Sequence, residues 1–288
     1  MKKIWTWLGA AAGLLTGWAV FENTAMLRIH RYTAEMQGLP RIVQISDLHK
    51  RHFGDGQKLL IRKVAVCKPE YILITGDLIS RTVTDFTETE KLLRSLCAIA
   101  PVIVSEGNHE ADLMPQHYAE LRAAVQRSGA RYLKNECIRL GDIRIAGLAL
   151  SSEYFRGGGR FGFSGEKECT TETMHRLLGD CPEHTLLLAH NPLCFPVYAE
   201  WGAKLTLSGH VHGGAVRLPL IGGLLSPERK FFPEYDKGRF RIGAAEMIVS
   251  GGLGKLRFLN PPEICLITSA LQYDKISQKQ TACTADIS

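Results

Sequence analysis

Five short polar motifs in this 288-residue sequence carry side chains that commonly bind metal ions. They supply two aspartates, one asparagine and four histidines, namely Asp47, His49, Asp77, Asn108, His190, His210 and His212. This mixture of oxygen and nitrogen donors suits Mn, Fe or Zn better than the all-oxygen sites of Mg or Ca. Seven donors exceed what one tetrahedral zinc ion can use. If one aspartate bridges, they hold two divalent ions with four contacts each, as a two-metal hydrolase requires.

Each motif directly follows an apolar segment that is typical of a β-strand. The five segments are residues 41–46, 70–75, 101–105, 185–189 and 204–207. In open α/β sheets the ligand site lies beyond the carboxyl ends of the strands, so these strands can deliver the donors to one crevice. Residues two apart on an extended chain face the same way, which pairs Asp47 with His49 and His210 with His212.

Helical spacing alternates with these strands in the first half of the chain. We expect helices at residues 56–67, 87–99 and 115–127, and further strands at 143–150, 246–250 and 264–268. Alternating strands and helices, followed by closely spaced strands, predict an α/β protein with a mixed sheet. Two glycine-rich segments, residues 156–165 and 213–238, are expected to be loops.

The ordered motifs D-x-H, GD, GNHE, H and GHVH resemble those of the calcineurin-like metallophosphoesterase superfamily over residues 41–268. The resemblance implies a four-layer α/β/β/α sandwich with two mixed sheets. It also implies that one ion is held by Asp47, His49, Asp77 and His212. The second ion would be held by Asp77, Asn108, His190 and His210, so that Asp77 bridges the pair. His109 would not bind metal; as the catalytic residue it would protonate the leaving oxygen or stabilise the transition state.

A narrower resemblance concerns the substrate. Phe53-Gly54 after D-L-H, and SPERKFFPEYDKG at residues 226–238, are similar to a membrane-associated bacterial subgroup that is compared with UDP-2,3-diacylglucosamine pyrophosphatases. The resemblance implies hydrolysis of a phosphodiester or diphosphate bond in a lipid-linked substrate of the UDP-diacylglucosamine type. Glycine stands at position 251, where a polar or basic residue is expected in this subgroup. Apolar residues among basic ones at 215–232 either pack beneath the second sheet or meet a lipid tail.

Residues 4–21 form an uncharged, mostly apolar stretch that is preceded by Lys2 and Lys3. A helix of this length spans roughly 27 Å, just short of a bilayer core of about 30 Å. Tryptophans stand near both ends of the stretch, where interfacial aromatic residues belong. No small-x-small site follows it, so we expect an uncleaved transmembrane helix; a cleaved signal peptide is the alternative.

The sequence therefore predicts three parts. They are an N-terminal membrane anchor at residues 1–26, a metallophosphoesterase domain at 27–273 and a frayed polar tail at 274–288. A short basic tail before a single anchor favours a catalytic domain on the outer face of the cell membrane. The eight cysteines, which include no C-x-x-C pair, favour the reducing cytoplasm, so the cytoplasmic face is the alternative.

The charge balance bears on the class of partner. Thirty-five Lys and Arg residues against 29 Asp and Glu residues give a formal net charge of +6. This excess suits an anionic substrate or membrane surface but is too small for a nucleic-acid-binding protein, so nucleic acid is not an expected partner. Alternatives to the proposed hydrolase are a catalytically silent metal-binding scaffold of the same fold, a phosphoprotein phosphatase and a nuclease. The sequence leaves the oligomeric state open.

Overall fold

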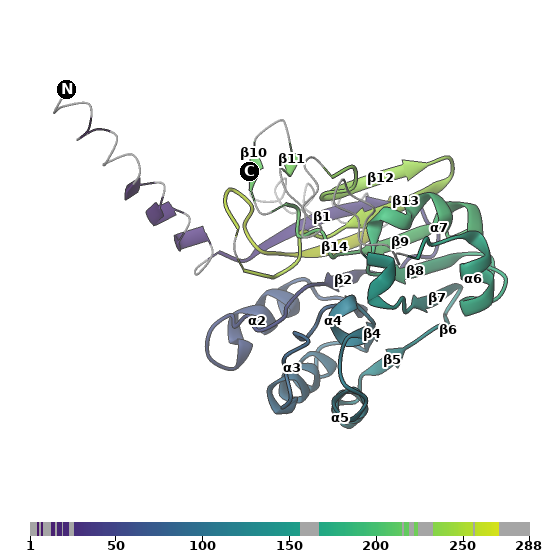
Figure 1. The fold of residues 1–288 in the computed structure, drawn as a ribbon, viewed down its shortest axis with the longest axis horizontal. Coiled ribbons are helices and arrows are strands. Elements are labelled where there is room, and N and C mark those ends of the chain that lie inside the picture. Colours follow the sequence, from purple (N-terminus) through teal and green to yellow (C-terminus); the bar gives the residue numbers. More distant parts are fainter. Residues whose placement is uncertain are drawn as a thin grey trace, which may run out of the picture.

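The computed structural model describes most of the chain from residue 26 to residue 270 and a few residues before it (Figure 1). The described residues are 5, 7, 13–14, 16–18, 20–22, 26–155, 167–214, 216–218, 222–223, 233–255 and 257–270. They form two six-stranded sheets, a two-stranded ribbon and helices on the outer face of each sheet.

The first sheet has the strand order β1-β14-β2-β3-β4-β5. Its strands are β1 (Arg28–Ala34), β2 (Ile42–Ile45), β3 (Tyr71–Thr75), β4 (Val102–Ser105), β5 (Arg131–Leu133) and β14 (Glu263–Ser269). The four strands from β2 to β5 run parallel, and β1 runs parallel to β14, whereas β14 is antiparallel to β2. The carboxyl ends of β2, β3 and β4 therefore lie at one edge of a mixed sheet.

The second sheet has the order β12-β13-β9-β8-β7-β6. Its strands are β6 (Glu136–Leu140), β7 (Ile143–Leu148), β8 (Thr185–Ala189), β9 (Leu205–Ser208), β12 (Gly238–Ile242) and β13 (Ala245–Val249). The four central strands run parallel, and the two edge strands β6 and β12 are antiparallel to their neighbours. A separate ribbon pairs β10 (Arg217–Leu218) with β11 (Gly222–Gly223).

Three hydrophobic clusters separate four layers. The first sheet is covered by α2 (Lys58–Val66), α3 (Thr87–Cys97) and α5 (Pro115–Ser128), and the second by α6 (Thr171–Leu178) and α7 (Phe195–Trp201). In β3, Ile72 and Ile74 pack against the helices, whereas Leu73 packs against the second sheet, as the alternation of side chains along a strand requires. The remaining short turns are η1 (Asp55–Gln57), α4 (Asn108–Ala111), η2 (Ser152–Phe155) and η3 (Pro192–Cys194). The order helix, sheet, sheet, helix confirms the expected α/β fold with two mixed sheets.

The strands and helices predicted from apolar periodicity agree with the structure to within a few residues. The edge strands β1, β5, β6 and β12 and the helices α6 and α7 are not predicted from apolar periodicity. The edge strands are half-exposed and carry charged residues, so they lack the continuous apolar run of a central strand. The segment 213–238, predicted to be a loop, contains the ribbon of β10 and β11.

Several predictions fall on residues that the structure does not describe. These are most of the anchor at 1–26, the glycine-rich loop at 156–165, most of the segment 215–232 and the tail at 274–288. Among the described residues, no helix is both long enough and apolar enough to cross a bilayer. The seven cysteines in the described part of the chain are all free thiols.

Candidate metal centre

All five polar motifs lie at the carboxyl ends of neighbouring strands. The first sheet contributes the residues after β2, β3 and β4, which are Asp47, His49, Asp77 and Asn108. The second sheet contributes the residues after β8 and β9, which are His190, His210 and His212. The strand order of each sheet therefore places the predicted donors on adjacent chain segments, as expected for a ligand site at the ends of parallel strands.

Three groups of side chains lie close enough to hold a metal ion, with ligand atoms within 4.8 Å of one another. The groups are Asp47 with His49 and His212, Asp77 with His190 and His210, and His49 with Asp77 and His109. In the assignment that the family resemblance implies, the first group belongs to one ion and the second group to the other. The third group places the ring of His109 against the same donors, with its Nε2 3.8 Å from Asp77 Oδ2.

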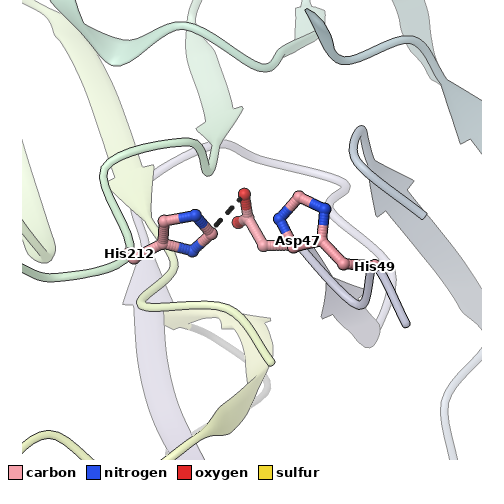
Figure 2. Close-up of side chains that lie close together, drawn as sticks. All are labelled: Asp47, His49 and His212. Carbon is pink, nitrogen blue, oxygen red and sulfur yellow. Dashed lines mark ion pairs between the residues drawn. The ribbon is translucent and has the colours of Figure 1, made fainter. Parts of the chain in front are cut away.

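Asp47 lies between the first two donor groups. In Figure 2 the rings of His49 and His212 flank its carboxylate, and Nδ1 of His212 is 3.8 Å from Asp47 Oδ1. Nε2 of His190 is 3.7 Å from the same oxygen and 3.3 Å from Asp77 Oδ2. The two donor groups are therefore contiguous, as a pair of neighbouring ions requires.

One ligand atom supports occupation by a cation. Asn108 Oδ1 is buried and has no hydrogen-bond partner among the described residues. Buried polar atoms almost always have a partner in native proteins, so such an atom calls for an explanation. Asn108 belongs to the predicted donor set, and a bound divalent ion would satisfy its Oδ1. The residues present therefore fit a metal centre.

Buried carboxylates give the site a negative potential. Asp47 and Asp77 are almost fully buried, and burial alone would raise the pKa of each. The neighbouring histidines outweigh burial, so both carboxylates have pKa values below the ordinary one and stay ionised at neutral pH. Burial disfavours a charged His190, but the attraction of Asp77 and Asp47 is stronger and raises its pKa to about 10. The site thus favours positive charge between the carboxylates, which divalent cations would supply.

The histidines on the open side of the site behave differently. Burial lowers the pKa of His109 to about 4 and that of His212 to about 3. Both rings are therefore neutral at pH 7. A neutral imidazole has one nitrogen with a free lone pair, which metal coordination and hydrogen-bond acceptance both need.

The ligand loops hold their backbone in an unusual conformation. Five donor residues have positive φ angles between 50° and 71°, and they are Asp47, His49, Asp77, His210 and His212. Non-glycine residues adopt this left-handed region rarely, and clusters of such residues are typical of functional sites. The chain passes so close to itself here that a Cβ at Gly209 would lie 1.9 Å from Ser46 Oγ, and one at Gly107 would lie 2.3 Å from Asp77 Oδ1. Only glycine fits at these two positions.

Glu110 is a supporting residue to which the sequence analysis assigns no role. Its carboxylate is buried and accepts backbone N–H groups of Asp77, Ile79 and Gly107 at 2.8–3.1 Å. Burial and the nearby charge of Asp77 raise its pKa to about 8. It follows Asn108-His109 directly in the GNHE motif, and this position is the feature of the sequence that could have identified it.

Lys237 and Glu263 occupy the space beside position 251. A Cβ at Gly251 would lie 3.1 Å from Lys237 Cδ and 3.2 Å from Glu263 Oε1. Lys237 is almost buried and forms an ion pair with Glu263, whose other oxygen accepts the Gly251 N–H at 2.8 Å. A basic group thus reaches position 251 from the segment before β12, and glycine at this position leaves room for it.

The site is more exposed on one side than on the other. The side chains of His49, His109 and His212 are 18%, 23% and 26% exposed, whereas that of His190 is 1% exposed. The ring of His49 lies between the other two, with centroids 4.6 Å from His109 and 5.4 Å from His212. These three rings form the accessible side of the site, which we call the histidine rim.

Comparison with known proteins agrees with this geometry. The family model for calcineurin-like phosphoesterases matches residues 40–214. An uncharacterized metallophosphoesterase of Bacillus subtilis, YkuE, is 28% identical over 285 residues, which cover 90% of this chain and 92% of the relative. UDP-2,3-diacylglucosamine pyrophosphatase LpxG of Chlamydia trachomatis is 27% identical and covers 89% of this chain and 94% of its own. Phosphodiesterase YaeI of Escherichia coli is 25% identical, over 79% of this chain and 81% of its own.

Proposed function

The chain belongs to the calcineurin-like phosphoesterase family and is a metal-dependent phosphoester hydrolase, and we propose that it cleaves a phosphodiester or diphosphate bond in a lipid-linked substrate at a membrane surface. The observation that carries the hydrolase is the convergence of six of the seven predicted donors, all but Asn108, from two sheets on one site. Members of this family use two divalent ions. When bound, such a pair clamps the phosphoryl group and activates a water for attack.

The division of the ligands between the ions is part of the proposal. Asp47, His49, Asp77 and His212 would hold one ion, and Asp77, Asn108, His190 and His210 the other. Asp77 would then bind both ions. Two hydrogen bonds support this role: its backbone N–H donates to Glu110, and its Oδ1 accepts the N–H of His109 at 2.9 Å. Both contacts fix the direction of the carboxylate.

His109 would act on the leaving oxygen. The backbone N–H of Arg81 donates to His109 Nδ1 at 3.1 Å, so Nδ1 is the acceptor and Nε2 carries the proton of the neutral ring. Nε2 is the ring atom that faces Asp77 and the metal ligands. The residue therefore presents an N–H to the reacting phosphoryl group without displacing a ligand. It would stabilise the charge that develops on the leaving oxygen by donating this N–H as a hydrogen bond.

Exposed cations beside the histidine rim support an anionic substrate. Lys50 follows His49, and Lys255 follows Gly254, where a Cβ would lie 3.3 Å from the ring of His212. Arg81 bonds to His109 through its backbone N–H, while its guanidinium is paired with Asp112 at 2.6 Å. Two of the three rim histidines thus have an exposed lysine close to them. Such a distribution attracts a substrate with more than one negative charge, as a diphosphate has.

The membrane and the lipid are supported by separate observations. Trp5, Trp7 and Leu14 of the predicted anchor are among the most exposed large apolar side chains of the described residues, at 73–76%. Large exposed apolar side chains of this kind suit a lipid environment. LpxG relatives are named as pyrophosphatases of a diacylated nucleotide sugar. We propose a single-pass anchor in the cell membrane with the catalytic domain on the outer face.

Substrate profiling of the full-length protein in detergent micelles with Mn²⁺ tests the function. We expect turnover of bis(p-nitrophenyl) phosphate and a higher kcat/KM for UDP-2,3-diacylglucosamine. UDP-N-acetylglucosamine is the matched control, because it carries the same diphosphate without the acyl chains. Equal kcat/KM values on the two nucleotide sugars would contradict the lipid-linked substrate, and metal-independent turnover would contradict the metal centre.

The segment 215–232 offers a second test of the lipid. We expect Leu224→Ser with Leu225→Ser to slow hydrolysis of UDP-2,3-diacylglucosamine and to spare bis(p-nitrophenyl) phosphate. Val66→Ser is the control, because Val66 is an exposed apolar residue on α2. Equal losses on both substrates with a lower Tm would assign these leucines to core packing instead.

The side of the membrane is tested by labelling. Cys137 is exposed on β6 and provides a reporter. A membrane-impermeant maleimide should modify Cys137 in intact spheroplasts if the catalytic domain lies outside. Modification of Cys137 only after permeabilisation would place the domain on the cytoplasmic face.

A further inference from the structure

Residues of the loop between β13 and β14 form hydrogen bonds with the backbone of His212, one of the proposed metal ligands. We call residues 254–260 of this connection the bracing loop; its residue 256 lies outside the described residues. The Arg257 guanidinium is buried, donates from Nε to the Gly254 carbonyl at 2.8 Å and donates from Nη1 to the His212 carbonyl at 3.1 Å. Asn260 Nδ2 donates to the carbonyls of His212 at 2.7 Å and Gly214 at 2.9 Å. The bracing loop thus supplies two donors to the backbone of His212.

His212 needs such support. Its φ is 54°, in the left-handed region that a bulky residue adopts only when its surroundings hold it there. Its Nδ1 is 3.8 Å from Asp47 Oδ1, and a Cβ at Gly254 would lie 3.3 Å from the same nitrogen. Movement of the bracing loop would therefore disturb the position of the ring beside Asp47.

The N-terminal segment is attached to the same loop. Glu22 is 1% exposed and accepts the backbone N–H of Leu259 at 2.7 Å. The residues just before Glu22 are different, because Trp18 and Phe21 are 45% and 50% exposed. Figure 1 shows the described residues from 13 to 22 leading away from the two sheets.

The contact crosses almost the whole sequence. Glu22 and Leu259 are 237 residues apart, and Leu259 itself has a φ of 56°. A buried carboxylate without a partner is costly, so Glu22 and the Leu259 N–H hold each other in place. The same loop also binds the stem of the 215–232 segment, since Arg217 donates its N–H to the Phe258 carbonyl at 3.0 Å. The bracing loop therefore joins the N-terminal segment, that stem and His212.

We propose that Glu22 is a positioning residue that makes the N-terminal segment part of the metal site: by fixing the bracing loop it holds His212 beside Asp47. This inference rests on the proposed metal-dependent hydrolase function. It adds that the segment supports one of the two ions and not the other, because Glu22 is linked through the bracing loop to His212 and, among the described residues, has no such link to His190.

Manganese-binding isotherms of the full-length protein in detergent test the inference. Outer-sphere partners of a ligand typically contribute about 10–100-fold to metal affinity, and we expect that loss for Asn260→Ala. Glu22 acts one contact further away, so Glu22→Ala should weaken one of the two binding steps about 3–10-fold and leave the other unchanged. Glu22→Gln, whose amide oxygen can still accept the Leu259 N–H, should restore most of the affinity. Glu70→Ala is the control: Glu70 accepts the Arg41 N–H near the opposite end of β3 and should change neither step.

The outcomes separate this inference from the hydrolase assignment. A Glu22→Ala isotherm identical to wild type overturns the inference, as does equal weakening of both steps together with a lower Tm. If Glu22→Ala yields no folded protein, Glu22→Asp carries the same expectation, since it keeps the charge and draws it away from Leu259. A wild-type protein that binds fewer than two Mn²⁺ ions would contradict the proposed metal centre itself.

Discussion

The carboxylate of Glu110 accepts the backbone N–H of Asp77 at 2.9 Å, and the same oxygen accepts the N–H of Gly107 at 2.8 Å. Its other oxygen accepts the N–H of Ile79 at 3.1 Å. One buried side chain thus ties the loop after β3 to the loop after β4. These are the loops that deliver Asp77 and Asn108, so the distance between the two proposed ligands depends on Glu110.

Replacement of Glu110 should therefore affect stability and metal binding together. Glu110→Gln turns an NH₂ group toward at least one of three backbone donors, which should cost about 1–3 kcal/mol in the free energy of unfolding. Metal affinity should fall by about 10–100-fold. Chemical denaturation and a Mn²⁺ titration measure the two effects. Glu246→Gln is the control. Glu246 is a buried carboxylate near the start of β13, whereas the proposed ligands follow the carboxyl ends of strands, so this substitution should lower stability alone.

Asp77 should control the occupancy of the whole centre. Because the proposal places Asp77 between both ions, Asp77→Ala should lower the metal content and abolish turnover together. Elemental analysis of the wild-type protein should find about two transition-metal ions per chain. A clear stoichiometry of one, or an active Asp77→Ala protein, would contradict the two-ion centre.

His109 should matter for chemistry rather than for metal content. The N–H that Arg81 donates to Nδ1 leaves only Nε2 for the substrate. His109→Ala should keep its metal ions and lose roughly 10²–10⁴ in kcat. The loss should be smaller for a p-nitrophenyl leaving group, which needs little protonation. Loss of the metal ions from His109→Ala would instead make it a ligand, as its position in the third donor group allows.

The metal-free protein should be most stable near pH 6.5. The pKa values of His190 and Glu110 are raised to about 10 and about 8, so the stability they contribute at lower pH is lost as pH rises through those values. The pKa values of His109 and His212 are lowered to about 4 and about 3, so their contribution is present above the unfolded value of about 6.5 and lost as pH falls. Thermal unfolding of chelator-treated protein between pH 4 and 10 measures this. His190→Asn should flatten the alkaline side, and a constant Tm from pH 6.5 to 10 in the wild type would contradict the assignment.

The sequence alone predicted the donor set and its position at the carboxyl ends of the strands. Apolar runs such as residues 70–75 and 185–189 predict strands from local periodicity, and polar residues directly after such strands must lie at their carboxyl ends. Parallel neighbours then bring Asp77 and Asn108, which follow β3 and β4, to the same edge through the geometry of the fold class. No long-range information is needed for this step.

The tertiary structure decided everything that depends on contacts between distant segments. The pairing of β1 with β14, the bond from Leu259 to Glu22 and the approach of Lys237 to Gly251 join segments whose separation in the chain carries no local signal. The same holds for exposure: His190 and His212 are both donors at strand ends, but packing between the sheets buries one and leaves the other on the rim. Periodicity reports how a side chain lies on its own element, whereas burial and bracing follow from which elements pack against it.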